Sequence, residues 1–570
     1  MSFFQILRPA KTYDVCIVGS GAAGGTAAKV LTEAGFDVVM LEAGPMLDPG
    51  KHYTDHKWVY NLQHHGFGVG GSGYNEQGNR ELDVAHIGNR IEGEPYTSDP
   101  DSPFSWTRAR ILGGRTNHWN RVALRFADAD FQQGTLTGAG EDWPIRYSDI
   151  APYYDKADSF IGVYGTRENI PHSPDGIFQP PPKPRCSDLM VKRGCEKLSI
   201  PCIPGRAAII TQTHNGRPPC HYCGQCTRGC STASTFSSSQ VMIPQALATG
   251  HLTVAPFAMA REITVDKQGK ANGVSYIEKN TRTDQHVRAK AVVVGASACE
   301  SARLLLNSKS RLFPTGLANS SGAAGRYMMD SSATGVSGFF PQLTSLPPHN
   351  DEGTGSVHVY IPWWKYDRKN DFIGGYHIEI LSGRQMPGPH AFGWIGERYQ
   401  GYGMGLKSKC REVYGNVVDF AARGSMLPNR DSYCAIDPEV VDQWGIPVLR
   451  FHFRWSDNEV KLARDMNESA SAIIEAAGGQ VVGESGGPDA LYKYLVPSGV
   501  AHEVGTVRMG NDVKTSVLNG FCQAHDVKNL FVTDGACFTT NPDKNPTLSI
   551  VALSWRATEY LVDEAKRGNL

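Results

Sequence analysis

Residues 13–44, YDVCIVGSGAAGGTAAKVLTEAGFDVVMLEAG, decide the fold class of this 570-residue chain. The apolar, β-branched run Tyr13–Val18 predicts a buried parallel strand, and Asp37–Leu41 predicts a second one. A Gly-x-Gly-x-x-Gly turn and an Ala-rich helix lie between them. This order of strand, turn, helix and strand predicts a Rossmann-like unit that binds a dinucleotide.

The glycines and one acidic residue give this unit its ligand chemistry. Gly19, Gly21 and Gly24 let the backbone approach a pyrophosphate, and the helix N-terminus offers free N–H groups and a positive dipole end to that anion. Glu42 follows the second strand, where a carboxylate accepts hydrogen bonds from a ribose diol. A glutamate there argues against a 2′-phosphate, but the motif does not separate FAD from NAD.

Composition indicates a folded protein, and the charge pattern favours a small-molecule partner over nucleic acid. Apolar residues make up 40% and charged residues 20% of the chain, close to the globular average. The net charge is −1 and there is no Lys/Arg-rich run, so we expect no nucleic-acid partner.

No apolar run reaches the ~20 residues of a membrane helix, so we expect no membrane span. The N-terminus lacks an export signal, which predicts a cytoplasmic protein, with periplasmic co-export on a partner as the alternative.

Two further segments predict parts of the same nucleotide-binding domain. In HVRAKAVVVGASACESARLLLNS (286–308), Ala291–Val294 reads as a strand that returns to the first sheet, with or without a ligand contact. In the C-terminal part, AHEVGTVRMG places His502 in a Gly-rich loop, and a helix is expected to begin at Asn545-Pro546. Taken singly, Asn545 reads as a helix N-cap and His502 as a hydrogen-bonded loop histidine.

Residues 335–495 predict a different kind of sheet, because their strands alternate between apolar and polar residues. In FIGGYHIEIL the apolar side chains share one face, and His377 and Glu379 share the other. In VLRFHFRW three apolar residues oppose Arg450, His452 and Arg454. Such polar faces are either solvated or form a sugar-binding platform over the cofactor.

The opening fingerprint, the segment LGGRTNHW (112–119) and the C-terminal part resemble the glucose–methanol–choline (GMC) family of flavin oxidoreductases, from near residue 12 to near residue 563. The resemblance implies FAD as the cofactor. It implies that His502 and Asn545 face the flavin ring and the substrate hydroxyl. The residues expected to contact FAD are Gly19, Gly21, Gly24, Glu42, Asp534 and Gly535.

The chemistry of alcohol oxidation agrees with these implied roles. The hydroxyl proton has to leave while hydride moves to flavin N5, and a neutral imidazole suits the base. Asn545 would hold the oxygen without competing for the proton. The helix that begins there would direct its positive end at the flavin edge where negative charge develops.

The Gly-Gly segment adds further expected FAD contacts at Gly113, Gly114, Asn117 and His118. In pyranose oxidases and some membrane-associated sugar dehydrogenases of the family, a similar segment ending in His-Trp carries the histidine that tethers the flavin. A covalent bond from His118 to FAD and ordinary packing against FAD are the two alternatives. Asn117 departs from the pyranose oxidase residue.

The substrate class follows from segments between residues 142 and 257, among them DWPIRYSDIAPYYDKAD and QALATGHLTVAPF. They resemble bacterial glucoside 3-dehydrogenases, which oxidise a sugar ring hydroxyl to a 3-keto sugar. The Pro/Gly-rich stretch 164–185 is expected to be an ordered loop or lid rather than a linker, because aromatic and apolar residues interrupt it.

Four of the thirteen cysteines stand close together in CHYCGQCTRGC (220–230). The spacing matches a ferredoxin-type run for an iron–sulfur cluster, although Ser231 stands where that run usually has Pro. Structural zinc and free thiols are the alternatives. A cluster would give the electrons a path to an acceptor protein, a small subunit or a quinone. The four predicted ligands are Cys220, Cys223, Cys226 and Cys230.

The predicted architecture is therefore α/β, a Rossmann-like FAD-binding domain with an inserted antiparallel-sheet substrate domain. The predicted FAD domain comprises 1–163, 235–334 and 496–570, with a Pro- and Cys-rich insertion at 164–234 and the substrate domain at 335–495. The predicted reaction is oxidation of a secondary sugar or glycoside hydroxyl. One alternative is an oxygen-using alcohol oxidase acting on a pyranose, sterol or polyol, and another is a non-enzymatic flavin-binding protein with structural zinc.

Overall fold

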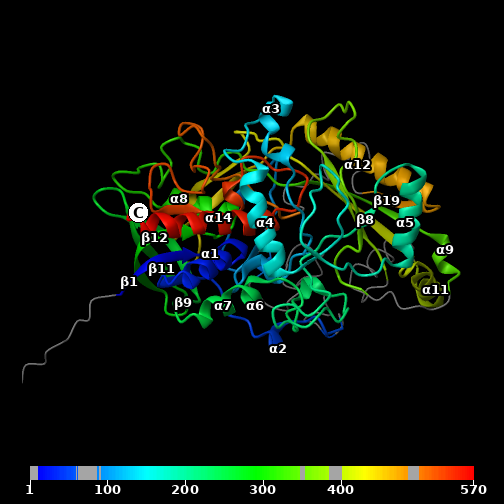
Figure 1. Ribbon diagram of the computed structural model, residues 1–570, viewed down its shortest axis with the longest axis horizontal. Coiled ribbons are helices and arrows are strands. Elements are labelled where there is room, and N and C mark those ends of the chain that lie inside the picture. Colours follow the sequence, from blue (N-terminus) through cyan, green and yellow to red (C-terminus); the bar gives the residue numbers. More distant parts are fainter. Residues whose placement is uncertain are drawn as a thin grey trace, which may run out of the picture.

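The computed structural model shows two sheets at opposite ends of the molecule's long axis (Figure 1). Strands β1, β11 and β12 lie at one end, and β8 and β19 lie at the other beside helices α5 and α12. The structure describes residues 11–58, 61, 87–88, 91–346, 353–383, 401–484 and 500–570.

The first sheet has seven strands in the order β10-β11-β12-β1-β2-β9, with β20 also paired to β12. β1, β2, β9, β12 and β20 are linked by parallel pairings, whereas β10, β11 and β12 form an antiparallel extension. The predicted return of the 286–308 segment to this sheet is confirmed, since β12 lies beside β1. The strands are β1 (Thr12–Val18), β2 (Val38–Leu41), β9 (Leu252–Ala255), β10 (Ala258–Val265), β11 (Ala271–Glu278), β12 (Thr283–Val294) and β20 (Leu530–Val532).

Helices from both ends of the chain pack together beside this sheet. The Ala-rich helix α1 (Ala22–Glu33) follows β1, and α14 (Thr547–Lys566) packs against it. The Ser554 hydroxyl of α14 donates to the Ala23 carbonyl oxygen at 2.9 Å. α4 (Tyr147–Ile161) packs on α14, and α8 (Ala298–Asn307) follows β12. The C-terminal segment thus completes the domain that the N-terminal segment begins.

The second sheet is antiparallel, in the order β19-β13-β16-β15-β14-β8, which confirms the predicted fold class. Helices α12 (Asp457–Ala476) and α5 (Cys186–Lys197) share its hydrophobic core. The strands are β8 (Ile203–Pro204), β13 (Ser332–Phe339), β14 (Val359–Ile361), β15 (Tyr376–Leu381), β16 (Val417–Gly424) and β19 (Gln480–Glu484). β8 comes from the Pro- and Cys-rich segment, which therefore contributes to this sheet.

The polar face of β15 is buried, so the solvated alternative is wrong for this strand. His377 and Glu379 are as inaccessible as Tyr376, Ile378 and Ile380 on the opposite face. A period of two correctly predicts which side chains share a face. It does not predict what covers that face.

The VLRFHFRW segment packs with the first sheet rather than the second. Leu449, Phe451 and Phe453 are buried in the core that also contains strands of the nucleotide-binding sheet. On the other face, Arg450 and Arg454 form ion pairs with Asp99. The segment includes β18 (Pro447–His452), which joins β17 (Tyr433–Val441) and β4 (Thr97–Ser98) in a three-stranded sheet.

The Pro/Gly-rich stretch after residue 164 is an ordered loop organised around the buried Arg206. The Arg206 guanidinium donates to the carbonyl oxygens of Thr166, Ser173 and Pro174 at 2.6–3.2 Å and pairs with Asp175 at 2.8 Å. Buried backbone carbonyls need such donors, so one side chain fixes the course of the loop.

Shorter elements complete the described fold. The strands are β3 (Ile87–Gly88), β5 (Arg108–Ala109), β6 (Val163–Tyr164) and β7 (Phe178–Gln179). The α-helices are α2 (Pro49–His52), α3 (Gln133–Thr137), α6 (Ser238–Val241), α7 (Ile243–Ala248), α9 (Pro341–Thr344) and α11 (Gly403–Val413). The 3₁₀ turns are η5 (Gly114–Asn117), η6 (Asp128–Phe131), η7 (Cys226–Arg228) and η8 (Gly535–Cys537).

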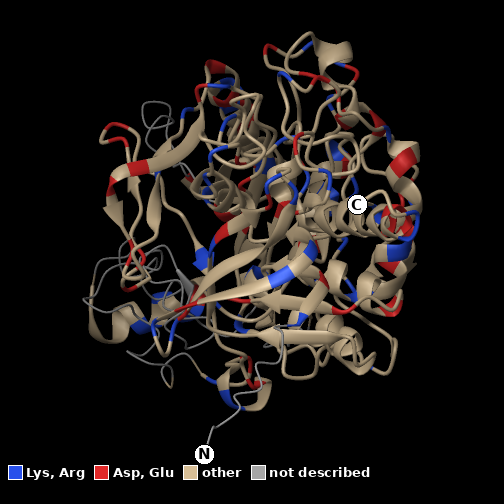
Figure 2. Ribbon diagram, turned by 90° about the vertical axis from the view of Figure 1, so that its left-hand side faces the viewer, with Lys and Arg blue, Asp and Glu red and all other residues tan. Residues whose placement is uncertain are grey.

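Charged residues of both signs are interspersed over the ribbon (Figure 2). Among the helices that the structure describes, none is both long and apolar enough to cross a membrane.

Candidate active site

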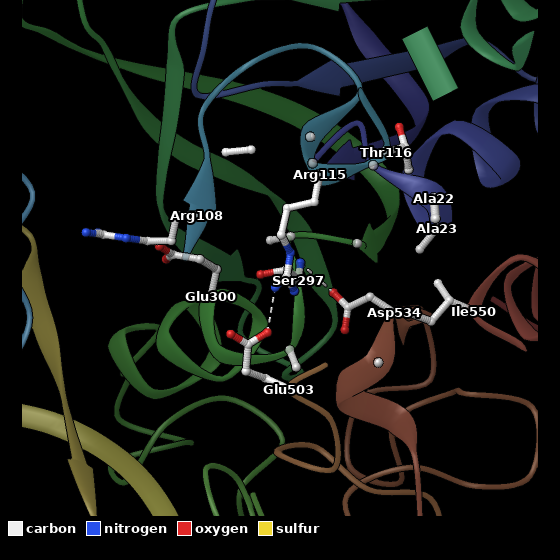
Figure 3. Close-up of a pocket in the computed structure, with 18 of the residues that line it drawn as sticks. Ala22, Ala23, Arg108, Arg115, Thr116, Ser297, Glu300, Glu503, Asp534 and Ile550 are labelled. Atoms are coloured by element: carbon white, nitrogen blue, oxygen red, sulfur yellow. Dashed lines mark hydrogen bonds and ion pairs between the residues drawn. The ribbon is translucent and has the colours of Figure 1, made fainter. Parts of the chain in front are cut away.

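A cavity of about 500 Å³ lies at the carboxyl ends of β1, β2 and β12 and extends to β15 and β16 of the second sheet. Figure 3 shows part of its lining, contributed by α1, the turn after β5, and the segments around Ser297, Glu503 and Asp534. The predicted residues that line it are Gly19, Gly21, Glu42, Gly114, His118, Glu379, His502, Asp534, Gly535 and Asn545. Four other predicted residues do not line it, namely Gly24, Gly113, Asn117 and His377.

The three fingerprint glycines have different geometric roles. At Gly19, where φ is +93°, a Cβ would lie 2.4 Å from the Gly295 carbonyl oxygen. At Gly24 it would lie 2.0 Å from the Gly19 carbonyl oxygen, so Gly24 permits close packing of α1 on β1. At Gly21 a Cβ would meet no described atom within 4 Å. Gly21 borders the cavity at the start of α1, where the open backbone fits the FAD pyrophosphate.

Glu42 and the Gly-Gly turn are joined through Ser20. The Ser20 hydroxyl donates to Glu42 Oε2 and accepts from the Gly113 N–H at 2.8 Å. The Gly44 N–H donates to Glu42 Oε1 at 2.9 Å. Burial raises the pKa of Glu42. The carboxylate sits at the carboxyl end of β2, where the ribose of a dinucleotide would lie.

Asn117 supports the Gly-Gly turn from behind. Its Nδ2 donates to the carbonyl oxygens of Leu112 and Gly114, each at 2.9 Å, and its Oδ1 accepts from Tyr53 Oη at 2.9 Å. The next residue, His118, lines the cavity. Burial lowers the pKa of His118 to about 3, assisted by nearby arginine charges, so its imidazole is neutral.

Asp534 ties two walls of the cavity together. Its carboxylate accepts from the Ser297 N–H at 2.9 Å (Figure 3). It also accepts from the Ser301 hydroxyl at 2.5 Å and from the Ala536 N–H at 2.9 Å. Burial raises the pKa of Asp534. Its neighbour Gly535 also lines the cavity. Asp534 and Gly535, both predicted to contact FAD, thus lie where β20 ends, beside the start of α8.

His502 is held at its backbone and at its ring. Its N–H donates to Asp330 Oδ1 at 2.8 Å, and its Nδ1 lies 3.0 Å from Ser331 Oγ. Arg115 donates to the Ala501 carbonyl oxygen at 2.8 Å. It also pairs with Glu503 at 2.6 Å (Figure 3). Burial lowers the pKa of His502 to about 3. The contact with Ser331 at Nδ1 leaves Nε2 for a substrate.

The Asn545 side chain forms a hydrogen bond with the second sheet and does not cap helix α14. Its Nδ2 donates to Glu379 Oε1 at 3.1 Å. In the described structure, no side chain caps α14, so Asn545 does not act as the N-cap. The buried Asn545 Oδ1 has no hydrogen-bond partner among the described residues. An amide oxygen in this state can accept a hydrogen bond from a ligand hydroxyl.

A row of buried charges holds Glu379. His377 Nε2 lies 3.4 Å from Glu379 Oε1, and His377 Nδ1 lies 3.7 Å from Asp543 Oδ2. Although burial opposes charging, the contacts with Asp543 and Glu379 raise the pKa of His377. Burial also acts to raise the pKa of Glu379, but His377 and Arg423 lower it to about 2. Glu379 therefore faces the cavity as a carboxylate, and His377, predicted to bind substrate, contacts Glu379 without lining the cavity.

The cysteine segment does not support the predicted metal centre. Within the described residues, no three of the four cysteine sulfurs lie within 4.8 Å of one another, as a zinc site would require. The iron–sulfur prediction likewise finds no support in this arrangement.

Sequence reasoning missed four residues that shape the catalytic end. Arg115 belongs to the LGGRTNHW motif, and its position there was the available signal. Asp330 and Ser331 hold His502, and Arg423 lines the cavity. Asp330, Ser331 and Arg423 belong to no recognisable sequence motif. Sequence could not place them near His502 and Glu379, because that proximity arises only when β13 and β16 fold against the C-terminal loop.

Comparison with known proteins identifies two matches to family models. Residues 14–310 match the N-terminal model described as GMC oxidoreductase, and residues 428–554 match the C-terminal one. The chain is 30% identical to 2-methyl-1,2-propanediol dehydrogenase from Mycolicibacterium austroafricanum, over 96% of this chain and 95% of that protein. It is 24% identical to the fructose dehydrogenase large subunit from Gluconobacter japonicus, over 97% and 98% of the two chains.

The same fold occurs in a solved structure. The crystal structure of pyridoxine 4-oxidase from Mesorbium loti superposes with a TM-score of 0.62 at 15% sequence identity, covering 96% of this chain and 99% of that one. At this identity the likeness concerns the fold.

The contrasting environments of Gly21 and Gly24 make a matched pair of substitutions. We expect Gly24→Ala to lower the melting temperature of the protein without FAD, because its Cβ would collide with the Gly19 carbonyl oxygen. Gly21→Ala should leave that melting temperature nearly unchanged and weaken FAD binding at least about tenfold, because Gly21 borders the cavity at the start of α1, where the pyrophosphate is expected to bind. Thermal unfolding and FAD titration of both variants measure these effects. Equal FAD affinity in Gly21→Ala and the unmodified protein would contradict the assignment.

Proposed function

The chain belongs to the GMC oxidoreductase family of FAD-dependent enzymes that act on CH–OH groups, and on this premise we propose that it oxidises a secondary hydroxyl of a sugar or glycoside to a ketone. The proposed position is C3 of the sugar ring. It rests on the resemblance of segments between residues 142 and 257 to glucoside 3-dehydrogenases.

One observation carries the proposal: a neutral imidazole, an amide oxygen without a described partner and an ionised carboxylate border one end of the nucleotide cavity. They belong to His502, Asn545 and Glu379. An imidazole can take a hydroxyl proton, and the other two groups can accept hydrogen bonds from hydroxyls. This combination suits a substrate with several neighbouring hydroxyl groups.

We assign the general base to His502 and the positioning of the reacting oxygen to Asn545. The hydroxyl proton passes to His502 Nε2, while Ser331 at Nδ1 fixes the orientation of the ring. FAD, when bound, supplies the hydride acceptor. The N-terminal end of α14 borders the same part of the cavity through Pro546 and Thr547, where its dipole favours developing negative charge.

Glu379 and Arg423 support a sugar as the substrate. Glu379 is an acceptor and the Arg423 guanidinium is a donor, and both line the cavity. Both groups already have partners within the protein, Asn545 and His377 for Glu379 and the Ala422 carbonyl oxygen for Arg423. Hydroxyl groups on adjacent ring carbons can use their remaining acceptor and donor positions, whereas a simple alcohol leaves those positions unfilled. Unpaired buried polar groups weaken binding, so such a site discriminates strongly against substrates that lack the hydroxyls.

A vicinal diol is the second candidate substrate, because it also presents two adjacent hydroxyls. The name of the 30% identical relative, 2-methyl-1,2-propanediol dehydrogenase, favours it. This relative and the fructose dehydrogenase large subunit are both named dehydrogenases, which supports an acceptor other than oxygen. The second name also supports an acceptor protein or small subunit, with a quinone as the alternative.

Anaerobic mixing with a panel of neutral glycosides, vicinal diols and simple alcohols tests the proposed function. We expect glycosides to bleach the flavin absorbance fastest and to give a keto sugar, whose carbonyl position is read by NMR. Faster bleaching by diols would select the second candidate. With substrate fixed, faster turnover with oxygen than with a dye acceptor would favour the oxidase alternative.

His502→Ala should keep FAD bound and slow flavin reduction by ~10²–10⁴, the usual contribution of a positioned general base. Stopped-flow reduction with the best glycoside measures the rate, and the flavin spectrum checks occupancy. His251→Ala, at an exposed histidine paired with Asp37, is the control and should reduce at the normal rate. Near-normal reduction in His502→Ala would refute the assignment.

The low pKa of His502 predicts a flat pH profile on the acid side. A base works in its unprotonated form, and a pKa of about 3 keeps His502 unprotonated from pH 5 upward. We expect the limiting rate of flavin reduction to change less than about threefold between pH 5 and pH 8. An ordinary histidine with a pKa near 6.5 would lose about 30-fold at pH 5. Single-turnover rates at saturating neutral substrate, with FAD content checked at each pH, distinguish the two.

We further propose that His118 attaches covalently to FAD. Its neutral imidazole borders the cavity beside the Gly-Gly turn, which supports the proposal. Acid precipitation should then leave yellow colour in the pellet, and His118→Ala should release it to the supernatant. His502→Ala serves as the control and should keep a yellow pellet. Release of the colour from the unmodified protein would show that FAD is held without a covalent bond.

A further inference from the structure

The cysteine-rich segment packs against residues 54–57, a contact that the proposed reaction does not use. The Thr54 N–H donates to the Arg228 carbonyl oxygen at 3.1 Å, and the Arg228 guanidinium donates to the Lys57 carbonyl oxygen at 3.1 Å. The N–H and hydroxyl of Ser231 both donate to Asp55 Oδ2, at 3.0 Å and 2.9 Å. Two segments far apart in sequence are thereby fixed side by side.

Three metal-ligating side chains converge at this contact. Asp55, His56 and His221 each offer a ligand atom, and these atoms lie within 4.8 Å of one another. The Asp55 side chain is 2% exposed and His56 Nε2 lies 3.6 Å from its Oδ2, whereas the His56 side chain is 58% exposed. The imidazole rings of His56 and His221 are 4.9 Å apart at their centroids and tilted by 32°.

We propose that Asp55, His56 and His221 bind one divalent zinc ion. Two imidazoles and one carboxylate are ligands that zinc commonly takes, and water completes the four-coordinate shell. The exposed histidines leave space for that water. Such a metal would compensate the charge of the buried Asp55 carboxylate and would hold the two neighbouring imidazoles beside it.

The surroundings of the three side chains support a metal site. Ser231 orients the Asp55 carboxylate, as outer hydrogen bonds orient metal ligands elsewhere. Thr232 Oγ1 lies 3.4 Å from His221 Nδ1, which leaves Nε2 for the metal. Proline, which the ferredoxin-type run usually has at 231, could not donate an N–H. The departure from that run is therefore part of the Asp55 environment.

The site connects to the FAD cavity through Tyr53. The Tyr53 ring lies against Gly229, where a Cβ would be 2.4 Å from the ring, and its hydroxyl donates to Asn117 at 2.9 Å. Asn117 in turn holds the Gly-Gly turn that lines the cavity. A metal that fixes residues 54–57 to the cysteine-rich segment therefore stabilises the support of this turn.

Metal analysis of tag-free, FAD-containing protein tests the proposal, with zinc as the probe. After removal of metal by a chelator, titration should restore one zinc per chain. His56→Ala and His221→Ala should each weaken zinc binding at least about 10–100-fold, since loss of even an outer-shell partner has such effects. His251→Ala is the matched control and should bind zinc normally. Flavin and circular dichroism spectra check that each variant is folded.

A Cys220→Ser, Cys223→Ser double variant separates this site from the thiols. It should keep its zinc, and cobalt bound to the unmodified protein should give a spectrum without a sulfur-to-metal charge-transfer band. The chelator should lower the melting temperature of the unmodified protein more than that of His221→Ala. The proposal is overturned if zinc does not bind stoichiometrically, if neither histidine substitution weakens binding, or if only the cysteine variant loses the metal.

Discussion

The contact between Gly24 of α1 and the Gly19 carbonyl oxygen determines how closely α1 approaches β1. A Cβ at Gly24 would lie 2.0 Å from that oxygen, so a larger residue would push the helix outward. α14 packs on α1, and Ser554 donates to the Ala23 carbonyl oxygen. Asn545, just before α14, therefore depends for its position on a contact between two glycines near the other end of the chain.

Burial disfavours the charged form of both His502 and Glu379, but it determines the protonation state of His502 alone. It keeps His502 neutral, because desolvation disfavours the imidazolium. Glu379 is equally buried but stays ionised, because His377 and Arg423 supply compensating positive charge. His377 is itself stabilised by Asp543, which pairs with Lys544. A neutral imidazole and an ionised carboxylate can thus coexist in one cavity, each held by its own partners.

Sequence patterns predicted many of the residues that line the cavity but fewer of the residues that hold them in place. The fingerprint glycines, Glu42 and the Gly-Gly segment are local in sequence, so their strand-turn-helix geometry follows from short-range rules. Asn117 belongs to such a motif but does not line the cavity. His377 and Glu379 share a strand face, yet only Glu379 lines the cavity. A residue's distance from a ligand depends on the elements packed around it, which a local pattern does not contain.

The sequence by itself determined the βαβ unit and the antiparallel character of the second sheet. It also identified His502 and Asn545 in the C-terminal part as candidate site residues. These depend on residues within one or two elements of each other. The tertiary structure decided that Asn545 bonds to Glu379 rather than capping its helix, that the β15 polar face is buried, and that His221 meets Asp55. Such contacts join residues more than a hundred positions apart, and their geometry is set by the packing of whole sheets and helices rather than by local backbone preference.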